Sequence, residues 1–310
     1  MEARQKMRRF LASAIALTVS LALLAGCGGA KKEQQPAAAA AKQKIVVDVI
    51  PTQASDKFKD QMKKLGSLLS QESGLDVEIR IPVDYATVVE DMRFGKSDVA
   101  YFGPFTYVVA NAQSGAKAFI TQNIKGKPYY YSYGIVPTGS PIKELDDKSI
   151  ATLKGKTIAL GDPASTSSSQ IPQLAMKNAG LDRQKDVTLV FTGAHDAVLK
   201  TVAAEKAAIG FVDSAIFEGS LSVKFPEDFK NVRVVWKSME LYQYPWAHRT
   251  ELDAGVVKKL QDAFLKIKDA EALEPFGADS FVIADDAKYD PVRDAARALG
   301  ISLGEYKLKK

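Results

Sequence analysis

The chain has 310 residues, of which 46% are hydrophobic and 25% charged, so a substantial core and room for two domains are expected. Its single cysteine, Cys27, cannot form a disulfide within the chain, and one thiol excludes a cysteine-based zinc or iron–sulfur site. Without residues 1–26, which hold four basic residues and one acidic residue, the net charge falls from +5 to +2, and no basic block or stripe remains to favour nucleic acid as a partner.

The N-terminal residues have the three-part pattern of a secretory signal peptide. Basic RQKMRRF precedes apolar LASAIALTVSLALLAG, and small residues lead into Cys27. The LAGC stretch resembles the lipobox of bacterial lipoproteins, in which cleavage precedes a cysteine that carries diacylglycerol. An uncleaved membrane helix is the alternative, but the apolar run is shorter than the roughly 20 residues of a span. We expect a signal peptide over residues 1–26, lipid attachment at Cys27 and a flexible tether over 27–43.

From residue 44 onward, segments of two kinds alternate. Strand patterns cover residues 45–50, 76–81, 99–102 and 157–161, whereas helical spacing joins Phe58, Met62, Leu65 and Leu69 and extends over 85–94. Strands that alternate with helices predict open α/β sheets, which bind ligands at the carboxyl ends of their strands.

Five hydroxyl residues follow the strand at 157–161, in the stretch ASTSSSQIPQL. Helical spacing begins at Ile171, and Pro172 suits a first helical turn, so the run marks the start of a helix. A helix N-terminus has unpaired N–H groups and a partial positive charge. Ser and Thr there either cap the helix or hold an anion, and both interpretations stay open.

The segments 85–103 and 195–213 align at a constant offset, each as a helix, a lysine-containing turn and a short apolar strand. Tyr85 and His195 then lie at equivalent helix starts, and Gly103 and Asp213 at equivalent strand ends. Two aromatic, extended segments, 129–138 and 232–249, are either connections between two lobes or further strands of one large domain.

Three motifs together resemble the substrate-binding proteins of phosphonate, phosphite and phosphate ABC transporters: YATVVEDMRFGKSDVAYFGPFTYVVA, GDPASTSSSQIPQLAMKNAGLD and HDAVLKTVAAEKAAIGFVDS. The resemblance covers about residues 44–300. It implies a type II periplasmic-binding-protein fold, with two α/β lobes joined by two crossing hinge strands. Residues 44–135 and 243–310 would form the first lobe, and 136–242 the second.

The resemblance also implies eight ligand-binding residues: Tyr85, Tyr101, Ser165, Thr166, Ser167, His195, Asp196 and Asp213. The Ser-Thr-Ser turn would hold the phospho group, although this chain has Ser168 where the family usually has glycine. A carboxylate at Asp213 suits a ligand that keeps a proton to donate or that carries an amine. Packing, strand-core and capping roles are the structural alternatives for these residues, and the tyrosines at 129–133 are interpreted as hinge strand.

The expected function is therefore a monomeric, lipid-anchored binding protein outside the cytoplasm, which passes a small phosphorus oxyanion to a permease and needs no cofactor or metal. A secreted hydrolase with Ser168, His195 and Asp213 as nucleophile, base and orienting acid is the main alternative, but the chain has no G-x-S-x-G elbow. A scaffold lipoprotein is a third class, and it would not need the hydroxyl run.

Overall fold

Residues 42–308 are described by the structure, which is a computed structural model of the chain. The predicted signal peptide and the lipid attachment at Cys27 lie outside the described residues. Within residues 42–308, no helix combines the length and the apolar character needed to traverse a bilayer.

The first sheet has six strands in the order β13-β4-β12-β3-β1-β2. Its strand β1 pairs in parallel with β2 and β3, whereas β12 runs antiparallel to β3 and β4. The strands are β1 (Lys44–Val49), β2 (Asp76–Arg80), β3 (Val99–Tyr101), β4 (Lys117–Asn123), β12 (Trp246–His248) and β13 (Ser280–Ile283). The C-terminal part of the chain contributes β13, which pairs with β4.

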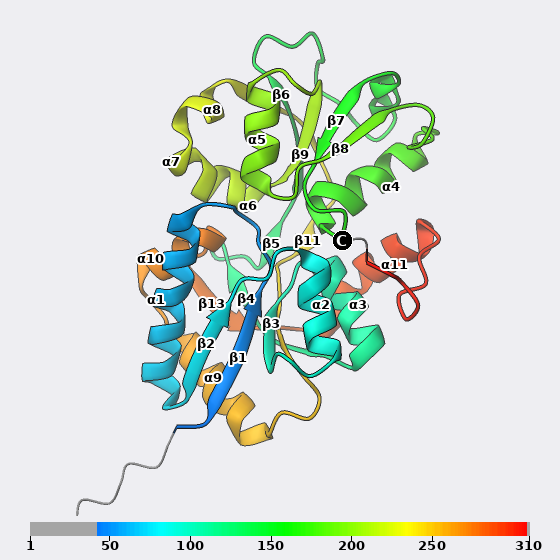
Figure 1. Cartoon of the computed structure of the whole chain (residues 1–310). Helices are drawn as coiled ribbons and strands as arrows, with labels where there is room; N and C mark the ends of the chain where they lie inside the picture. The colour runs from blue at the N-terminus through cyan, green and yellow to red at the C-terminus, as the bar shows by residue number, and fades with distance from the viewer. Residues whose placement is uncertain (1–41, 309–310) are drawn as a thin grey trace, which may run out of the picture. The chain divides into compact units, whose positions relative to one another are not determined.

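The second sheet has five strands in the order β10-β6-β9-β7-β8, with β7 parallel to β8 and β9 and with β6 antiparallel to β9 and β10. Its strands are β6 (Ser132–Pro137), β7 (Thr157–Leu160), β8 (Thr188–Phe191), β9 (Ile209–Asp213) and β10 (Val232–Lys237). In Figure 1, helices lie beside each of these two sheets.

Two connections run between the sheets, from β4 to β6 and from β10 to β12. They pair with each other through β5 (Tyr129–Tyr130) and β11 (Leu241–Tyr242), which form a small antiparallel sheet. The lobe boundaries proposed from the sequence remain a prediction; residue 135 lies inside β6, which pairs with β9 and β10 of the second sheet.

Capping residues mark both ends of the first helix. In α1 (Asp56–Ser73), the Ser55 hydroxyl accepts from the N–H of Phe58 at 3.3 Å, and Gly74 ends the helix with a positive φ of 72°. The others are α2 (Tyr85–Arg93), α3 (Pro104–Ser114), α4 (Ile171–Asn178), α5 (His195–Ala203), α6 (Ser214–Ile216), α7 (Ser222–Lys224), α8 (Pro226–Lys230), α9 (Ala254–Lys266), α10 (Ala270–Leu273) and α11 (Asp290–Ala298).

Aromatic side chains fill the core beside the first sheet. The Trp246 ring is fully buried, and its centroid lies 4.8 Å from that of Tyr101 and 4.7 Å from that of Phe264. This packing fixes Tyr101 at the end of β3, where the chain turns toward α3.

Helix α5 packs so closely on β9 that residue 210 must be glycine. A Cβ atom there would lie 2.6 Å from γ-carbons of both Val198 and Val202. We expect Gly210→Ala to lower the free energy of unfolding by about 1–3 kcal/mol through overpacking. Urea unfolding measures the change. Gly139→Ala is the control, because a Cβ at Gly139 meets no atom within 4 Å and its stability should stay within about 0.5 kcal/mol of wild type.

Candidate functional site

The hydroxyl run after β7 forms one π-helical turn, Thr166–Gln170, which continues directly into α4. The Ser165 hydroxyl accepts from the N–H of Ser168 at 3.2 Å, so Ser165 is the N-cap of this turn. Pro172 lies in the first turn of α4, as predicted. The cap therefore uses one hydroxyl of the five.

Two further hydroxyls of the run stabilise the fold. Ser168 Oγ accepts from the N–H of Gly161 at 2.7 Å and donates to the carbonyl of Phe211, which joins the ends of β7 and β9. Ser169 Oγ donates to the Pro163 carbonyl at 3.0 Å and accepts from Gln173. Both hydroxyls are thus fully engaged within the protein.

The remaining two hydroxyls, those of Thr166 and Ser167, lie beside the Tyr130 hydroxyl. Thr166 Oγ1 accepts from the N–H of Phe105 at 2.8 Å, at the start of α3, a helix whose N-cap Gly103 has no side chain. Ser167 Oγ is buried and has no hydrogen-bond partner among the described residues. Ser167 is therefore the member of the run whose hydroxyl has no partner within residues 42–308.

Four buried tyrosines lie around this turn. Tyr85 begins α2 and Tyr101 ends β3, as the resemblance suggested, and Tyr130 and Tyr244 join them from the two connections between the sheets. The Tyr244 ring centroid lies 5.5 Å from that of Tyr101 and 5.2 Å from that of Tyr130. Burial raises the pKa of all four phenols well above the usual value, so they remain protonated donors.

The sequence analysis interprets Tyr130, as one of the tyrosines at 129–133, as part of a hinge strand, and it does not single out Tyr244. Their hydroxyls are buried without a partner in the described part of the chain, and Tyr130 lies close to Thr166 and Ser167. The only sequence signal is their position in aromatic, strand-like segments, and that pattern is equally typical of a hinge strand.

His195 begins α5, and its ring points toward the end of β9. The ring Nδ1 accepts from the backbone N–H of Asp213 at 3.3 Å, which leaves the proton on Nε2. Nε2 is buried and lacks a partner among residues 42–308. Burial lowers the pKa of His195 to about 4, so the ring is a neutral N–H donor at pH 7.

Asp213 ends β9 and caps the short helix α6. Its Oδ1 accepts from the N–H groups of Ala215 at 2.7 Å and of Ile216 at 3.0 Å. Burial raises the pKa of Asp213 to about 7, although these bonds and the nearby Tyr244 hydroxyl favour the charged form. The Tyr244 hydroxyl is near the carboxylate without closing a hydrogen bond of ordinary geometry. Asp213 therefore titrates near neutral pH beside buried donors.

Asp196 lies apart from this group. Its carboxylate accepts from the N–H of Ala54 at 3.4 Å and lies 3.8 Å from Lys200 Nζ. Another carboxylate, that of Asp162, accepts from the N–H of Tyr85 at 3.3 Å, at the start of α2. Burial raises the pKa of Asp162 to about 6. Asp162 and Thr166 thus connect the segment after β7 to the N-termini of two helices beside the first sheet.

The geometry does not form a serine-hydrolase triad. His195 Nδ1 binds the backbone N–H of Asp213 rather than its carboxylate, so the acid does not orient the ring. Ser168 Oγ donates to the carbonyl of Phe211, which removes its proton from the reach of a base. Among residues 42–308, no group of three or more His, Cys, Asp or Glu side chains is placed to hold a metal ion.

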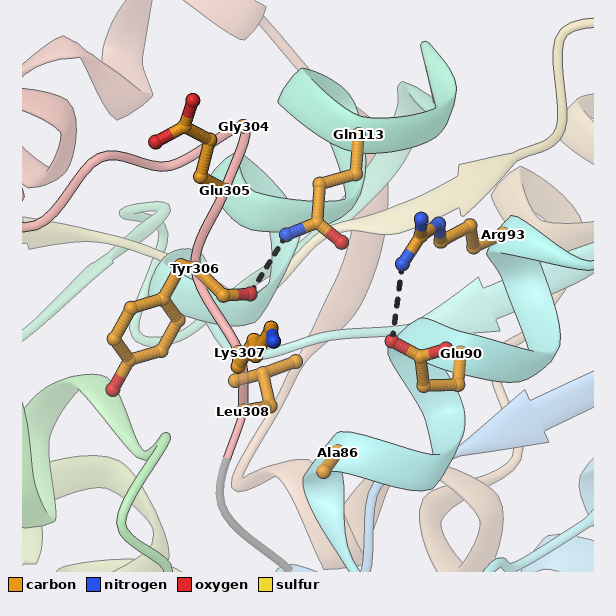
Figure 2. A pocket seen from close by; sticks show the side chains of 9 residues that line it. All are labelled: Ala86, Glu90, Arg93, Gln113, Gly304, Glu305, Tyr306, Lys307 and Leu308. Carbon is orange, nitrogen blue, oxygen red and sulfur yellow. Dashed lines mark hydrogen bonds and ion pairs between the residues drawn. The ribbon is translucent and has the colours of Figure 1, made fainter.

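A separate pocket lies between the C-terminal segment and helices α2 and α3 (Figure 2). There Gln113 Nε2 donates to the backbone carbonyls of Leu303 and Tyr306, at 3.1 and 2.9 Å, and so fastens the tail to α3. None of the eight predicted site residues lines this pocket, which is formed by Ala86, Glu90, Arg93, Gln113, Gly304, Glu305, Tyr306, Lys307 and Leu308.

Comparison with known proteins gives a consistent assignment. The family model for the periplasmic substrate-binding protein of phosphonate ABC transporters matches residues 47–289. The phosphate-import protein PhnD of Mycolicibacterium smegmatis is 28% identical over 308 residues, covering 90% of this chain and 94% of that protein.

Two solved structures confirm the predicted fold. A binding protein of a phosphonate ABC transporter from Pseudomonas aeruginosa superposes with a TM-score of 0.74 at 26% identity, covering 82% of this chain and 85% of that one. PhnD1 of Prochlorococcus marinus, in complex with methylphosphonate, gives 0.75 at 22% identity and 83% and 98% coverage. The chain therefore belongs to the family of phosphonate periplasmic substrate-binding proteins of ABC transporters, which are binding proteins and not enzymes.

Proposed function

We propose that this protein captures a small phosphorus oxyanion in the site formed by Ser167, Tyr130, Tyr244, His195 and Asp213, and delivers it to the permease of an ABC importer. The protein would act as a monomer held at the membrane by a lipid on Cys27. Phosphonate, phosphite and phosphate are the candidate ligands. The named relatives support phosphate and phosphonate as candidates, since one is a phosphate importer and another is in complex with methylphosphonate.

The observation that carries the proposal is the set of buried donors without partners. Ser167 Oγ, Tyr130 Oη, Tyr244 Oη and His195 Nε2 all lack a hydrogen-bond partner among the described residues. A buried polar group left unpaired costs about 1–3 kcal/mol, so an anion that accepts from all four would be bound strongly. All four groups are uncharged at pH 7, because burial raises the phenol pKa values and lowers that of His195.

Asp213 adds discrimination among anions. Because a carboxylate repels an anion that has no proton, a ligand beside Asp213 must share a proton with it. A monoprotonated phosphonate, hydrogen phosphite or hydrogen phosphate can do so. Sulfate has a similar tetrahedral shape but carries no proton at neutral pH, and it should be rejected.

The test is a calorimetric and thermal-unfolding panel with phosphate, phosphite, methylphosphonate and aminoethylphosphonate, with sulfate as the matched control. At a ligand concentration 100 times the Kd, the bound form should be more stable by about 2.7 kcal/mol. At least one phosphorus oxyanion should give this stabilisation, and sulfate should give none. The proposed site would be ruled out if sulfate stabilised the protein as much as phosphate does. It would also be ruled out if none of the five anions stabilised the protein.

A further inference from the structure

The hydroxyl of Tyr101 is held by one member of a buried pair of amides, Gln122 and Gln243, which lie 121 residues apart in the sequence. Gln122 Nε2, at the end of β4, donates to Tyr101 Oη at 3.0 Å and to Gln243 Oε1 at 3.1 Å. Gln243 lies in the return connection between β11 and β12, and its backbone carbonyl accepts from the Tyr289 hydroxyl at 2.8 Å. Gln122 and Gln243 are each 1% exposed.

The direction of these hydrogen bonds determines what Tyr101 can offer a ligand. A phenol has one proton, and here its oxygen accepts from Gln122. Within residues 42–308, no hydrogen bond is donated by Tyr101, so its proton remains free for the site that contains Asp213 and Tyr244.

The two amides must turn together or not at all. If Gln122 alone were reversed, its Oε1 would face Gln243 Oε1, and two acceptors would be in contact. Reversal of both would let Gln122 accept the Tyr101 proton, and the site would then meet a lone pair in place of a donor. Gln122 Oε1 and Gln243 Nε2 have no partner among the described residues, whereas the backbone N–H of Tyr244 donates to Gln243 Oε1 at 3.4 Å and so favours the observed polarity.

We propose that Gln122, oriented by Gln243, is a positioning residue that keeps the Tyr101 hydroxyl as a hydrogen-bond donor to the bound oxyanion and thereby sets the affinity for it. This inference rests on the proposed oxyanion site. It adds a residue that does not touch the ligand, and it couples β4 and the return connection that contains Gln243 to the binding wall.

Comparison of glutamate substitutions at the two amide positions separates the effect of hydrogen-bond direction at Tyr101 from the effect of an added negative charge. In Gln122→Glu the carboxylate accepts the Tyr101 proton, so affinity for methylphosphonate at pH 8 should fall about 100-fold. In the matched variant Gln243→Glu, Gln122 still donates to both neighbours, and affinity should fall less than about 10-fold. Calorimetry from pH 5 to 8 measures how far the affinity of Gln122→Glu lies below that of wild type at each pH. This loss of affinity should become smaller as the pH falls, because the introduced, buried carboxyl becomes protonated.

A second pair of variants avoids a buried charge, in case Gln122→Glu does not fold by near-ultraviolet circular dichroism. Gln122→Met should weaken binding about 3- to 10-fold, and this effect should disappear in the Tyr101→Phe background, because Gln122 acts through the phenol. Equal deficits and pH profiles for the two glutamate variants, or an undiminished Gln122→Met effect in Tyr101→Phe, would overturn the inference. Failure of wild type to bind any phosphorus oxyanion would overturn the proposed function itself, and this inference with it.

Discussion

Replacement of Asp213 by asparagine is expected to stabilise the unliganded protein above pH 7 while weakening its affinity for a protonated oxyanion. Burial raises the pKa of Asp213 from 3.8 to about 7. The stability that protonation gives is present in full below pH 3.8 and is lost as the pH rises through 7. At pH 8 the buried charge therefore costs about 4 kcal/mol, and the neutral asparagine side chain would not carry it. The amide oxygen can still accept from Ala215 and Ile216, so the cap on α6 is kept.

Urea unfolding of both proteins between pH 4 and pH 8 measures this effect. The difference in free energy of unfolding between Asp213→Asn and wild type should be largest at pH 8 and should vanish near pH 4. His195 has the opposite dependence, because its pKa is lowered to about 4 and its contribution is lost on acidification, but it is common to both proteins and cancels in the comparison. Affinity for methylphosphonate should fall about 10- to 100-fold. An Asp213→Asn protein less stable than wild type at pH 8 would contradict the prediction.

The second large effect is expected from Ser167→Ala, with Ser169→Ala as its matched control on the same turn. Ser167 Oγ is buried without a partner among the described residues, so its removal should leave the free energy of unfolding unchanged or slightly raised. Loss of a hydrogen bond to a charged ligand should lower affinity about 10- to 100-fold. Calorimetry and urea unfolding on the same preparations measure the two quantities.

Ser169→Ala should show the reverse pattern. The Ser169 hydroxyl already donates to Pro163 and accepts from Gln173, so its removal should cost about 1 kcal/mol of stability. Affinity for the oxyanion should change less than about threefold. If both variants lost affinity equally, the turn would act as a unit, and the special role assigned to Ser167 would be wrong.

The electrostatic design of the site explains why these substitutions separate function from stability. The donors are neutral, and the charge nearest to them is the carboxylate of Asp213, which titrates near pH 7. Without a ligand, the unpaired donors and the buried acid reduce stability. The residues that we propose to bind the oxyanion therefore stabilise the fold least, which is a common trade-off at functional sites.

Much of the fold could be predicted from local patterns. Apolar runs and helical spacing placed β1, β2, β3, β7, α1 and α2, because burial of one face imposes a period on the sequence. The constant offset between segments 85–103 and 195–213 placed Tyr85 and His195 at the starts of α2 and α5. It placed Gly103 and Asp213 at strand ends, and the structure shows these two residues as the N-caps of α3 and α6. The resemblance of three motifs supplied the fold class.

The sequence by itself determined that five hydroxyls begin a helix, but only the tertiary structure decided which of them has no partner among the described residues. Ser165, Ser168 and Ser169 have partners within their own turn or on the neighbouring segments, whereas Ser167 is left without one in the described chain. Tyr130 and Tyr244 come together from two connections far apart in sequence, and no local period encodes such a meeting. Hydrogen-bond partnership is a property of packed neighbours, and for that reason the division between partnered and unpartnered hydroxyls appears only in three dimensions.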